Sequence, residues 1–155
     1  MRSKVLVAYF SASGVTARAA REIAAATGGE LFEIAPALPY SRADLDWTDK
    51  NSRSSVEMND EGCRPAMKSA PPDISGFNRI FIGFPIWWYV EPRIIDAFLE
   101  SLDLKGKEVV AFATSGGSGI AGAERRMRAL CPAAKWQKGK LVNRGAGDWA
   151  ASLER

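Results

Sequence analysis

The sequence predicts a single α/β domain, in which helices pack on both faces of an open parallel β-sheet. Strand-like runs alternate with helix-like segments along the chain, which is the pattern of successive β–α–β units. The runs Val5–Phe10 and Arg79–Phe84 are almost continuously apolar, as expected of strands that are buried on both faces. A chain of 155 residues is long enough for one domain with one sizeable core.

The expected elements follow one another in a regular order. Strands are expected at Val5–Phe10, Glu30–Ile34, Arg79–Phe84, Val109–Ala113 and near Lys140–Asn143. Helices are expected at Thr16–Thr27, Pro92–Leu102, Ala121–Leu130 and Gly147–Leu153. Gly28 suits the C-cap of the first helix, and Pro92 suits the first turn of the second. The third helix is expected to place Arg125, Arg126 and Arg128 on its solvent side.

Residues 36–77 interrupt the alternation, because a helix is due there and the pattern predicts none. The segment has many polar residues, little helical periodicity and five prolines, which are Pro36, Pro39, Pro65, Pro71 and Pro72. It also contains Tyr40, Trp47, Val56, Met58 and Met67, which are too many large side chains for a free linker. We therefore interpret residues 1–155 as one domain with a long loop insertion at 36–77 that covers a functional site.

The composition excludes several classes of function. No apolar run approaches the length of a membrane span, and the N-terminal apolar run is too short for a signal peptide, so a cytoplasmic protein is expected. The chain has no histidine, which excludes Ser–His and Cys–His catalysis and histidine-ligated zinc, and no metal site is expected. Cys63 and Cys131 are expected to be free thiols.

The net charge of +3 is unevenly distributed along the chain. Residues 104–155 contain 10 basic and 4 acidic residues, whereas residues 1–103 contain 11 basic and 14 acidic ones. A basic C-terminal third could attract an anionic partner or a phosphorylated cofactor, although a solvated helix face would account for the same charge. Nucleic acid is not an expected partner, because no basic stripe interleaved with aromatic residues is present.

Three unusual loops follow strands of the predicted sheet. The first is SASGVT, residues 11–16, which joins the first strand to the first helix. Backbone amides in a tight turn at a helix N-terminus bind anions, and the hydroxyls of Ser11, Ser13 and Thr16 could add donors. Gly14 allows a close approach of the backbone. The turn lacks the lysine of a nucleoside-triphosphate loop, and a simple N-cap would need only one of these residues.

The other two loops offer a flat apolar surface and a row of small residues. The sequence FPIWWYVEPR places three adjacent aromatics directly after a strand; since they cannot all enter one core, we expect one tryptophan to pack and one to be exposed beside a cleft. The sequence TSGGSG, residues 114–119, can bring backbone amides close to a planar ligand, although a plain βα turn has the same composition. Together the loops predict a phosphate, a flat heteroaromatic ring and its polar edge, which describes flavin mononucleotide (FMN).

On these three motifs the chain resembles the flavodoxin-like FMN proteins, over nearly its whole length. SASGVT is similar to their phosphate loop, [ST]-x-T-G-x-T, and PIWW and TSGGSG stand at the two loops that hold the ring. The likeness is greatest to small members with a long proline-rich segment in place of the second helix, which share a pattern of Tyr40, Arg53, Glu57 and Arg64–Pro65. The resemblance implies a flavodoxin-like open parallel five-stranded sheet in the order 2-1-3-4-5, with helices on both faces.

The resemblance also implies the residues that hold the cofactor. The phosphate would contact Ser11, Ser13, Gly14, Val15 and Thr16. The ring would lie against Pro85, Trp87, Trp88 and Tyr89. Its polar edge would bind Thr114, Ser115, Gly116, Gly117 and Gly119.

Three departures from the family favour a reductase over an electron carrier. Ser13 replaces the usual threonine, the chain is basic where electron-transfer flavodoxins are acidic, and TSGGSG lacks their ring-stacking aromatic. We therefore expect an FMN-dependent oxidoreductase that accepts hydride from NAD(P)H and reduces a small flat acceptor such as a quinone. No catalytic residue is assigned, because Arg53 and Glu57, at i,i+4 spacing, could simply form an ion pair.

Two rival functions stay open. One is a flavodoxin that carries single electrons to a redox partner protein, and the other is a flavin-free phosphate-binding module, which would leave the tryptophan pair without a role. Many flavin reductases of this fold form homodimers, but no segment of the sequence decides the oligomeric state.

Overall fold

The computed structural model describes residues 4–115 and 119–153. These residues form a five-stranded parallel sheet in the order β2-β1-β3-β4-β5, so the predicted fold class is confirmed. The strands are β1 (Val5–Tyr9), β2 (Glu30–Glu33), β3 (Arg79–Pro85), β4 (Glu108–Thr114) and β5 (Lys135–Leu141). The helices are α1 (Val15–Thr27), α2 (Arg53–Met58), α3 (Arg93–Glu100), α4 (Ala121–Leu130) and α5 (Ala146–Leu153).

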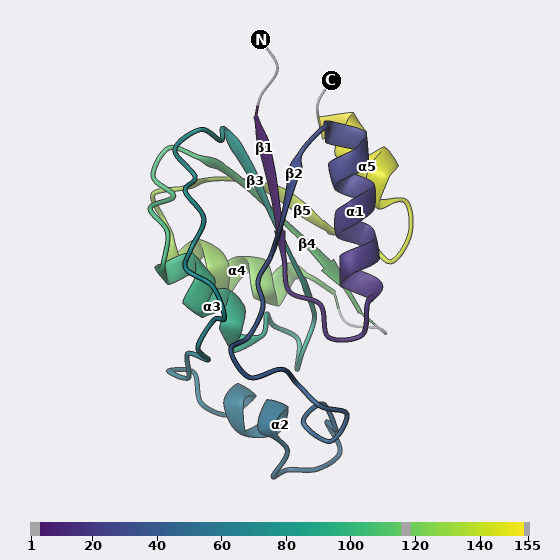
Figure 1. The fold of residues 1–155 in the computed structure, drawn as a ribbon, viewed down its shortest axis with the longest axis vertical. Coiled ribbons are helices and arrows are strands. Elements are labelled where there is room, and N and C mark those ends of the chain that lie inside the picture. Colours follow the sequence, from purple (N-terminus) through teal and green to yellow (C-terminus); the bar gives the residue numbers. More distant parts are fainter. Residues whose placement is uncertain (1–3, 116–118, 154–155) are drawn as a thin grey trace.

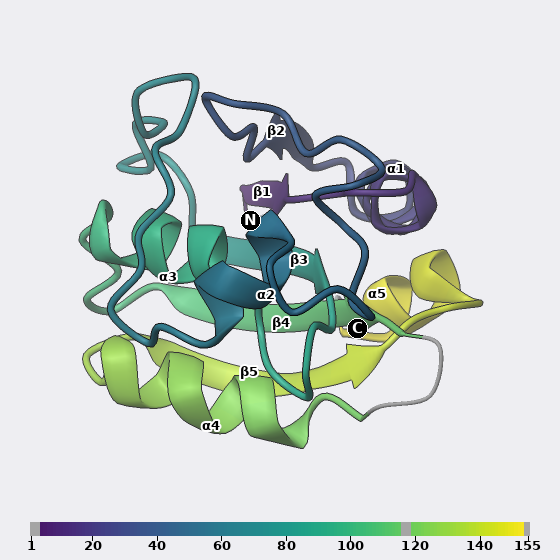
Figure 2. The ribbon, with the colours of Figure 1, turned by 90° about the horizontal axis from the view of Figure 1, so that it is seen from below.

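Two hydrophobic cores lie on opposite faces of the sheet. Because side chains alternate along a strand, Val5 and Val7 of β1 pack toward α1 and α5, whereas Leu6 and Ala8 pack toward α3 and α4. Seen from below, the two pairs of helices cover the two sides of the sheet (Figure 2). The central strands are therefore buried on both faces, which explains their nearly continuous apolar sequence.

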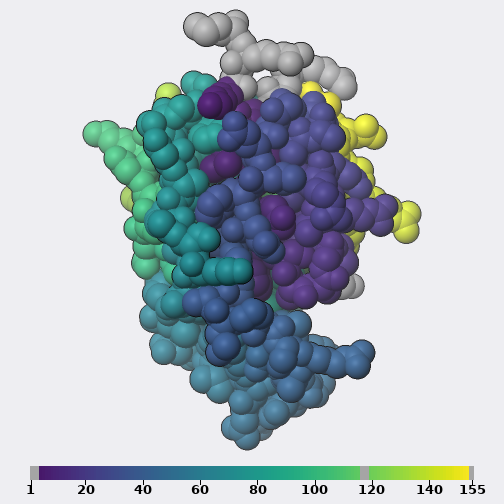
Figure 3. All heavy atoms as spheres, viewed as in Figure 1, coloured from purple at the N-terminus to yellow at the C-terminus, as the bar shows by residue number. Residues whose placement is uncertain are grey.

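The strand order places a crevice at the carboxyl edge of the sheet. The chain leaves β1 toward β2 on one side and returns to β3 on the other, so the loops after β1 and β3 diverge. In open parallel sheets this is the position where ligands bind. Helix α2 and the chain around it extend beyond this same edge (Figure 1) and form the lower end of the molecule in the space-filling view (Figure 3). The last residues of segment 36–77 run back along the sheet to its other edge, where the Asn78 N–H donates to the Lys4 carbonyl before β3 begins.

Two expectations about the elements were wrong. Strand β5 begins at Lys135, five residues before the expected Lys140, because it is an edge strand whose exposed positions are polar. Segment 36–77 contains the short helix α2, which the sequence did not predict. Its N-cap is Ser52, whose hydroxyl accepts a hydrogen bond from the Ser55 N–H over 3.3 Å.

The large side chains of segment 36–77 divide into two groups. Tyr40, Met58 and Met67 are buried or packed against the core, as expected of anchors. Trp47 and Val56 are not anchors, because 73% and 56% of their surfaces are exposed. Within the residues that the structure describes, no helix is long and apolar enough to span a membrane.

Candidate functional site

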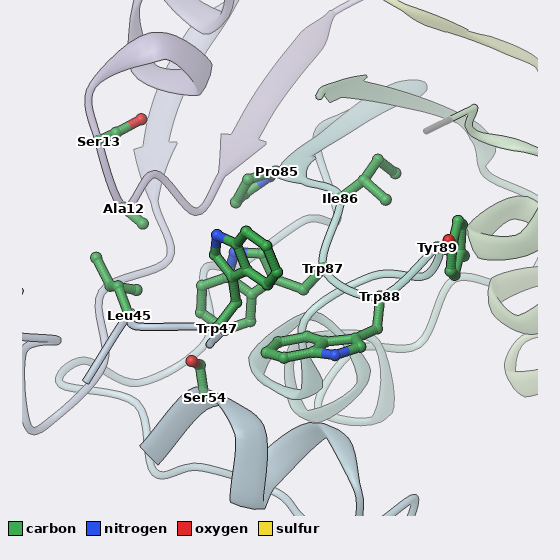
Figure 4. Close-up of a pocket in the computed structure, with 10 residues that line it drawn as sticks. All are labelled: Ala12, Ser13, Leu45, Trp47, Ser54, Pro85, Ile86, Trp87, Trp88 and Tyr89. Carbon is green, nitrogen blue, oxygen red and sulfur yellow. The ribbon is translucent and has the colours of Figure 1, made fainter. Parts of the chain in front are cut away.

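The three loops predicted from the sequence converge at the carboxyl edge of the sheet, around three adjoining cavities of about 490, 340 and 280 Å³. Ser13 lines all three. The largest is also lined by Ala12, Leu45, Trp47, Ser54, Pro85, Ile86, Trp87, Trp88 and Tyr89 (Figure 4). The second is lined by Val15, Pro85, Ile86, Trp87, Thr114, Ser115 and Asn143. The smallest is lined by Gly14, Val15, Arg18, Ala19, Arg21, Glu22, Val142 and Asn143.

The turn before α1 presents backbone amides to the smallest cavity. Gly14 has a φ of 96°, a left-handed conformation that glycine adopts without strain. The Ser11 hydroxyl accepts hydrogen bonds from the N–H groups of Gly14 and Ala17, at 3.1 and 3.2 Å. No described residue accepts from the N–H groups of Ser13, Val15 or Thr16. The turn therefore has unused amide donors at a helix N-terminus, which is the arrangement that binds an anion.

The Thr16 side chain has a different position from the predicted one. It is only 2% exposed, and its hydroxyl hydrogen-bonds the Thr114 hydroxyl over 2.8 Å. This buried bond joins the start of α1 to the end of β4, and so fixes the first loop relative to the third. The contribution of Thr16 to an anion site would come from its backbone N–H, whereas Ser13 lines all three cavities.

The loop after β3 contains a two-residue hairpin turn with a strained backbone. Trp87 and Val90 exchange backbone hydrogen bonds of 3.0 and 3.1 Å. The two residues between them, Trp88 and Tyr89, have φ values of 47° and 70°. Turns of this kind favour Asn–Gly, and a left-handed conformation costs a bulky residue about 1–2 kcal/mol. Strain of this kind is concentrated at functional sites.

The tryptophan pair is divided as the sequence predicted. Trp87 is half-buried and packs edge-on against Phe10 and Tyr40, with ring centroids 5.6 and 5.4 Å apart. Trp88 is 42% exposed and Tyr89 is 73% exposed. The hairpin therefore holds one aromatic ring in place and leaves two others exposed, on residues that line the largest cavity.

A polar network fixes the Tyr40 ring that contacts Trp87. Tyr40 donates a hydrogen bond to Glu57, and the Arg53 guanidinium lies 3.8 Å from the Tyr40 ring centroid. Burial and the neighbouring Glu57 carboxylate raise the pKa of Tyr40 above its usual range, so the phenol stays neutral. The predicted Arg53–Glu57 ion pair is confirmed, at 2.9 Å. Through the contact between Tyr40 and Trp87, the network fixes segment 36–77 relative to the hairpin.

The loop after β4 contributes Thr114 and Ser115 to the second cavity. Gly119 lines none of the three cavities, and Gly116 and Gly117 lie outside the described residues. Ser115 is held by a residue that was not predicted. The Asn143 side-chain amide accepts from the Ser115 N–H at 2.9 Å and donates to the Ser115 carbonyl at 2.7 Å.

The profile of the flavodoxin family matches residues 4–151 of the chain. The chain belongs to the flavodoxin family. A protein from Bacteroides eggerthii DSM 20697 assigned as a flavoprotein is 53% identical, with a TM-score of 0.93 over 97% of this chain and 95% of the other. A Bacteroides uniformis ATCC 8492 protein with the same assignment is 49% identical, with a TM-score of 0.93 over 99% and 98% of the two chains.

A more distant flavodoxin-like structure resembles this one in fold. The flavoprotein from Lactobacillus acidophilus NCFM, solved in complex with FMN, is 22% identical, with a TM-score of 0.70 over 88% of this chain and 91% of the other. None of the curated proteins matches the chain significantly.

Behind the hairpin, this member of the flavodoxin family has a cluster of buried charges. Glu91 and Asp96 are fully buried and Arg93 is 3% exposed. The Arg126 Nε lies 3.4 Å from Glu91, and Arg126 Nη2 lies 3.5 Å from Asp96, so the expectation that Arg126 faces solvent was wrong. Burial and the proximity of Asp96 raise the pKa of Glu91 to about 9. Glu91 therefore keeps its proton to a higher pH than an ordinary glutamate does.

Several residues of the site were not predicted from the sequence. Leu45, Trp47 and Ser54 reach the largest cavity from segment 36–77, although they are distant from the three motifs in sequence. The signal for Trp47 was a lone tryptophan in a polar segment, and the signal for Asn143 was a polar residue directly after the last strand. The described residues contain no cluster of His, Cys, Asp or Glu placed to hold a metal ion.

Proposed function

We propose that this protein binds FMN and acts as an oxidoreductase that accepts hydride from a reduced nicotinamide and passes electrons to a small flat acceptor such as a quinone. The observation that carries the proposal is the adjacency of the three cavities around Ser13. The smallest cavity has unused backbone amides, the second is lined by the polar end of β4, and the largest is lined by an aromatic hairpin. These are the surfaces that a phosphate, a heteroaromatic edge and a flat ring require.

The residues present fit FMN. The amides of Ser13, Val15 and Thr16 would hold the phosphate. Among the described residues that line the smallest cavity, Glu22 is the one acidic group, and it pairs with Arg18 at 3.4 Å. The end of β4 would hold the polar edge of the ring, with Thr114 fixed by Thr16 and Ser115 by Asn143. Pro85 and Trp87, which line both of the larger cavities, would flank the ring.

The chain contributes positioning and polarity to the reaction. FMN, when bound, supplies the redox chemistry, since it can take up a hydride and release electrons. The aromatic residues of the hairpin would exclude water beside the bound ring, and the Tyr40–Glu57–Arg53 network supports the side chain of Trp87. Backbone amides at the polar edge tune the affinity for added negative charge. No side chain is required as an acid or base, which is consistent with the absence of histidine.

The first test is an absorbance spectrum of the purified protein, before and after addition of FMN and desalting. We expect retained flavin bands in the near-ultraviolet and blue, and released flavin that is identified as FMN. Gly14→Ala should weaken FMN binding about tenfold. Gly28→Ala is the matched control, because Gly28 also has a left-handed φ and open space for a Cβ but lies away from the site. Absence of retained flavin and of tryptophan quenching by FMN would refute the proposal.

The same preparation separates a reductase from the one-electron carrier that the sequence left open. A reductase should oxidise NADH or NADPH directly and pass the electrons to a quinone. A carrier should show two well-separated one-electron midpoint potentials and no direct oxidation of either nicotinamide.

A further inference from the structure

Helix α4, strand β5 and the turn that follows them carry a concentration of positive charge that does not belong to the lining of the three cavities. Residues 119–145 contain seven basic residues and one acidic residue. The basic surface consists of the six that are exposed, which are Arg125, Arg128, Lys135, Lys138, Lys140 and Arg144. The seventh, Arg126, turns inward to the buried carboxylates of Glu91 and Asp96.

Contacts of Glu124 bring the two parts of the basic surface together. Its carboxylate accepts a hydrogen bond from the Gly139 N–H at 3.2 Å and lies 3.3 Å from the Arg128 guanidinium. Arg128 of α4 therefore lies beside the part of β5 that carries Lys138 and Lys140. Glu124 is the one acidic residue of this region, and its side chain is only 15% exposed, so the charge that a partner would meet is positive.

The two outer strands of the sheet carry opposite charges. Strand β5 has three exposed lysines, whereas strand β2, at the opposite end of the strand order, has exposed Glu30 and Glu33. Figure 2 shows α4 and β5 along one side of the molecule and β2 on the other. A charge distribution of this kind attracts an anionic partner to the side of β5 and orients it as it approaches.

The basic surface borders the candidate site at two places. At the end of β5, Asn143 lines the second and the smallest cavity, and Arg144 follows it. At the start of α4, a Cβ on Gly122 would lie 2.7 Å from the Tyr89 carbonyl oxygen, so the helix packs directly against the aromatic hairpin. A partner on the basic surface would therefore lie next to the site without entering its cavities.

The remaining chemistry of the surface favours a folded protein as the partner. Among the described residues of α4 and β5, no large apolar side chain is exposed, so the surface lacks the groups that insert into a membrane. Trp136 is half-buried and its Nε1 donates to the Cys131 carbonyl at 2.8 Å, so it is not placed to stack on a nucleic-acid base. A second copy that added its own β5 would bring like charges together.

We propose that the basic surface is a docking site for an acidic protein, whose own surface presents clustered Asp and Glu carboxylates, and that this protein docks transiently beside the candidate site. The proposal goes beyond the proposed function, because docking requires neither FMN nor a nicotinamide. Lysines on an edge strand also prevent strand pairing, but this role does not explain Arg125 and Arg128 on α4. Exposed ion pairs are individually weak and are screened by salt, so the complex should form quickly and dissociate as the ionic strength rises.

The test measures binding of a fluorescently labelled poly-L-glutamate peptide by fluorescence anisotropy, in 20, 50, 100 and 200 mM NaCl. The double variant Lys138→Glu, Lys140→Glu reverses two charges of the basic surface. Lys138→Gln, Lys140→Gln removes the same charges without reversing them, and thermal unfolding checks that each variant is folded. Arg42→Glu, Lys68→Glu is the matched control, because both residues are exposed on segment 36–77, line none of the three cavities and give the same net charge.

We expect the affinity of the unmodified protein for the peptide to fall at least tenfold between 20 and 200 mM NaCl. At 50 mM NaCl, the glutamate variant of Lys138 and Lys140 should bind at least tenfold more weakly and the glutamine variant about threefold more weakly, because the charges act at short range. The matched control should change the affinity less than threefold. Equal weakening in the control, or no binding at 20 mM NaCl, would overturn the proposal.

Two other occupants are outcomes of the same experiment. Tighter binding of a single-stranded oligodeoxythymidylate, or of phosphatidylglycerol vesicles, than of the peptide at 100 mM NaCl would overturn the assignment to an acidic protein. Sedimentation of the protein alone tests the remaining occupant. Self-association that is lost in Lys138→Glu, Lys140→Glu would assign the basic surface to a second copy of the chain, and would also overturn the proposal.

Titrations with and without FMN separate this inference from the proposed function. We expect the peptide to bind with the same affinity in both cases. If the protein binds the peptide through Lys138 and Lys140 but does not bind FMN, the docking surface stands and the proposed flavin function fails. If it binds FMN but the matched control and the glutamate variant bind the peptide equally, the docking surface alone is wrong.

Discussion

The two sides of the hairpin Trp87–Val90 differ in almost every physical property. On the outer side, Trp88 and Tyr89 are exposed, uncharged and held in a strained backbone conformation. On the inner side, Glu91 and Asp96 are fully buried among arginines and join α3 to α4. Each side has an unfavourable local feature, strain in one case and desolvated charge in the other.

The two sides differ in the interactions that compensate these unfavourable features. The buried charges hold several elements together, because the Arg93 guanidinium donates to the carbonyls of Met58 and Asp60 at 2.8 and 3.1 Å and lies 3.6 Å from Asp96. Within the part of the chain that the structure describes, no hydrogen bond or ion pair joins Trp88 or Tyr89 to another element. Substitutions on the inner side should therefore change stability, and substitutions on the outer side should change binding.

Arg93→Ala should have the largest effect on stability. It removes the donors for carbonyls of segment 57–60 and leaves Asp96 with less compensating charge in a buried position. Breaking such a pair costs roughly 3–5 kcal/mol, which corresponds to roughly 10 °C in melting temperature for a chain of this size. Urea and thermal unfolding measure this loss.

Arg18→Ala is the control for this variant. Arg18 pairs with Glu22 on the surface at 3.4 Å, and its side chain is 79% exposed, so its loss should cost less than about 0.5 kcal/mol. If Arg93→Ala instead left stability unchanged and weakened ligand binding, the division between the two sides of the hairpin would be wrong.

The pH dependence of stability should change with Glu91→Gln. Between the ordinary pKa of a glutamate and about 9, the folded protein keeps a proton on Glu91 that the unfolded chain has released. The free energy of unfolding should therefore fall as the pH rises through this window, by at most about 1.4 kcal/mol per pH unit from this group.

Glutamine keeps the shape of the protonated acid but cannot ionise, so Glu91→Gln should flatten this slope and stabilise the protein most at pH 8–9. Asp96 and Arg126 are the charged groups that face Glu91, and Arg93 and Arg64 reach Asp96. Urea unfolding at pH 6, 7, 8 and 9 measures the slope. An identical slope in both proteins would show that Glu91 is ionised in the native state.

The fold could be predicted because its signals are local and periodic. The apolar runs of β1 and β3 and the glycine after α1 mark elements without reference to distant residues. The start of strand β5 was predicted too late in the sequence, because an edge strand has exposed polar residues. Arg126 was wrongly expected to face solvent, because its partners, Glu91 and Asp96, lie about thirty residues earlier in the sequence. Partners that are brought together only by tertiary structure leave no periodic signal.

The candidate site shows the same limit. The turn at Gly14 and the aromatic hairpin were predicted because each is a short continuous motif with its own chemistry. Trp47 was interpreted as an anchor of the long segment, since the sequence gives no sign that the turn at 46–48 faces the cavity. Asn143 was predicted only as the last residue of the fifth strand. Its role in the site was not predicted, because its hydrogen bonds to Ser115 depend on the pairing of β4 with β5.

Tyr89→Gly should relieve strain on the outer side of the hairpin. Glycine adopts a φ of 70° without penalty, and the exposed Tyr89 ring has little burial to lose, so stability should rise by up to about 1 kcal/mol. The affinity for FMN should weaken, because Tyr89 lines the largest cavity, which has the aromatic lining that a flat ring requires. Tyr89→Phe keeps both the ring and the strain and should change neither quantity. A stability loss in Tyr89→Gly would show that the turn is not strained.

Asn143→Ala should have the smallest effect, and it tests a residue that belongs to neither side of the hairpin. The variant removes both hydrogen bonds to the Ser115 backbone, and since Asn143 is exposed, global stability should fall by less than about 1 kcal/mol. The end of β4 would nevertheless lose the constraint that places Ser115 against the second cavity, so the affinity for FMN should fall threefold to tenfold. Asn143→Asp keeps the acceptor but loses the donor and adds a negative charge to the cavity proposed for the phosphate, so it should weaken FMN binding at least as much as Asn143→Ala. Equal FMN affinity in all three proteins would show that the Thr16–Thr114 bond is sufficient to fix the loop.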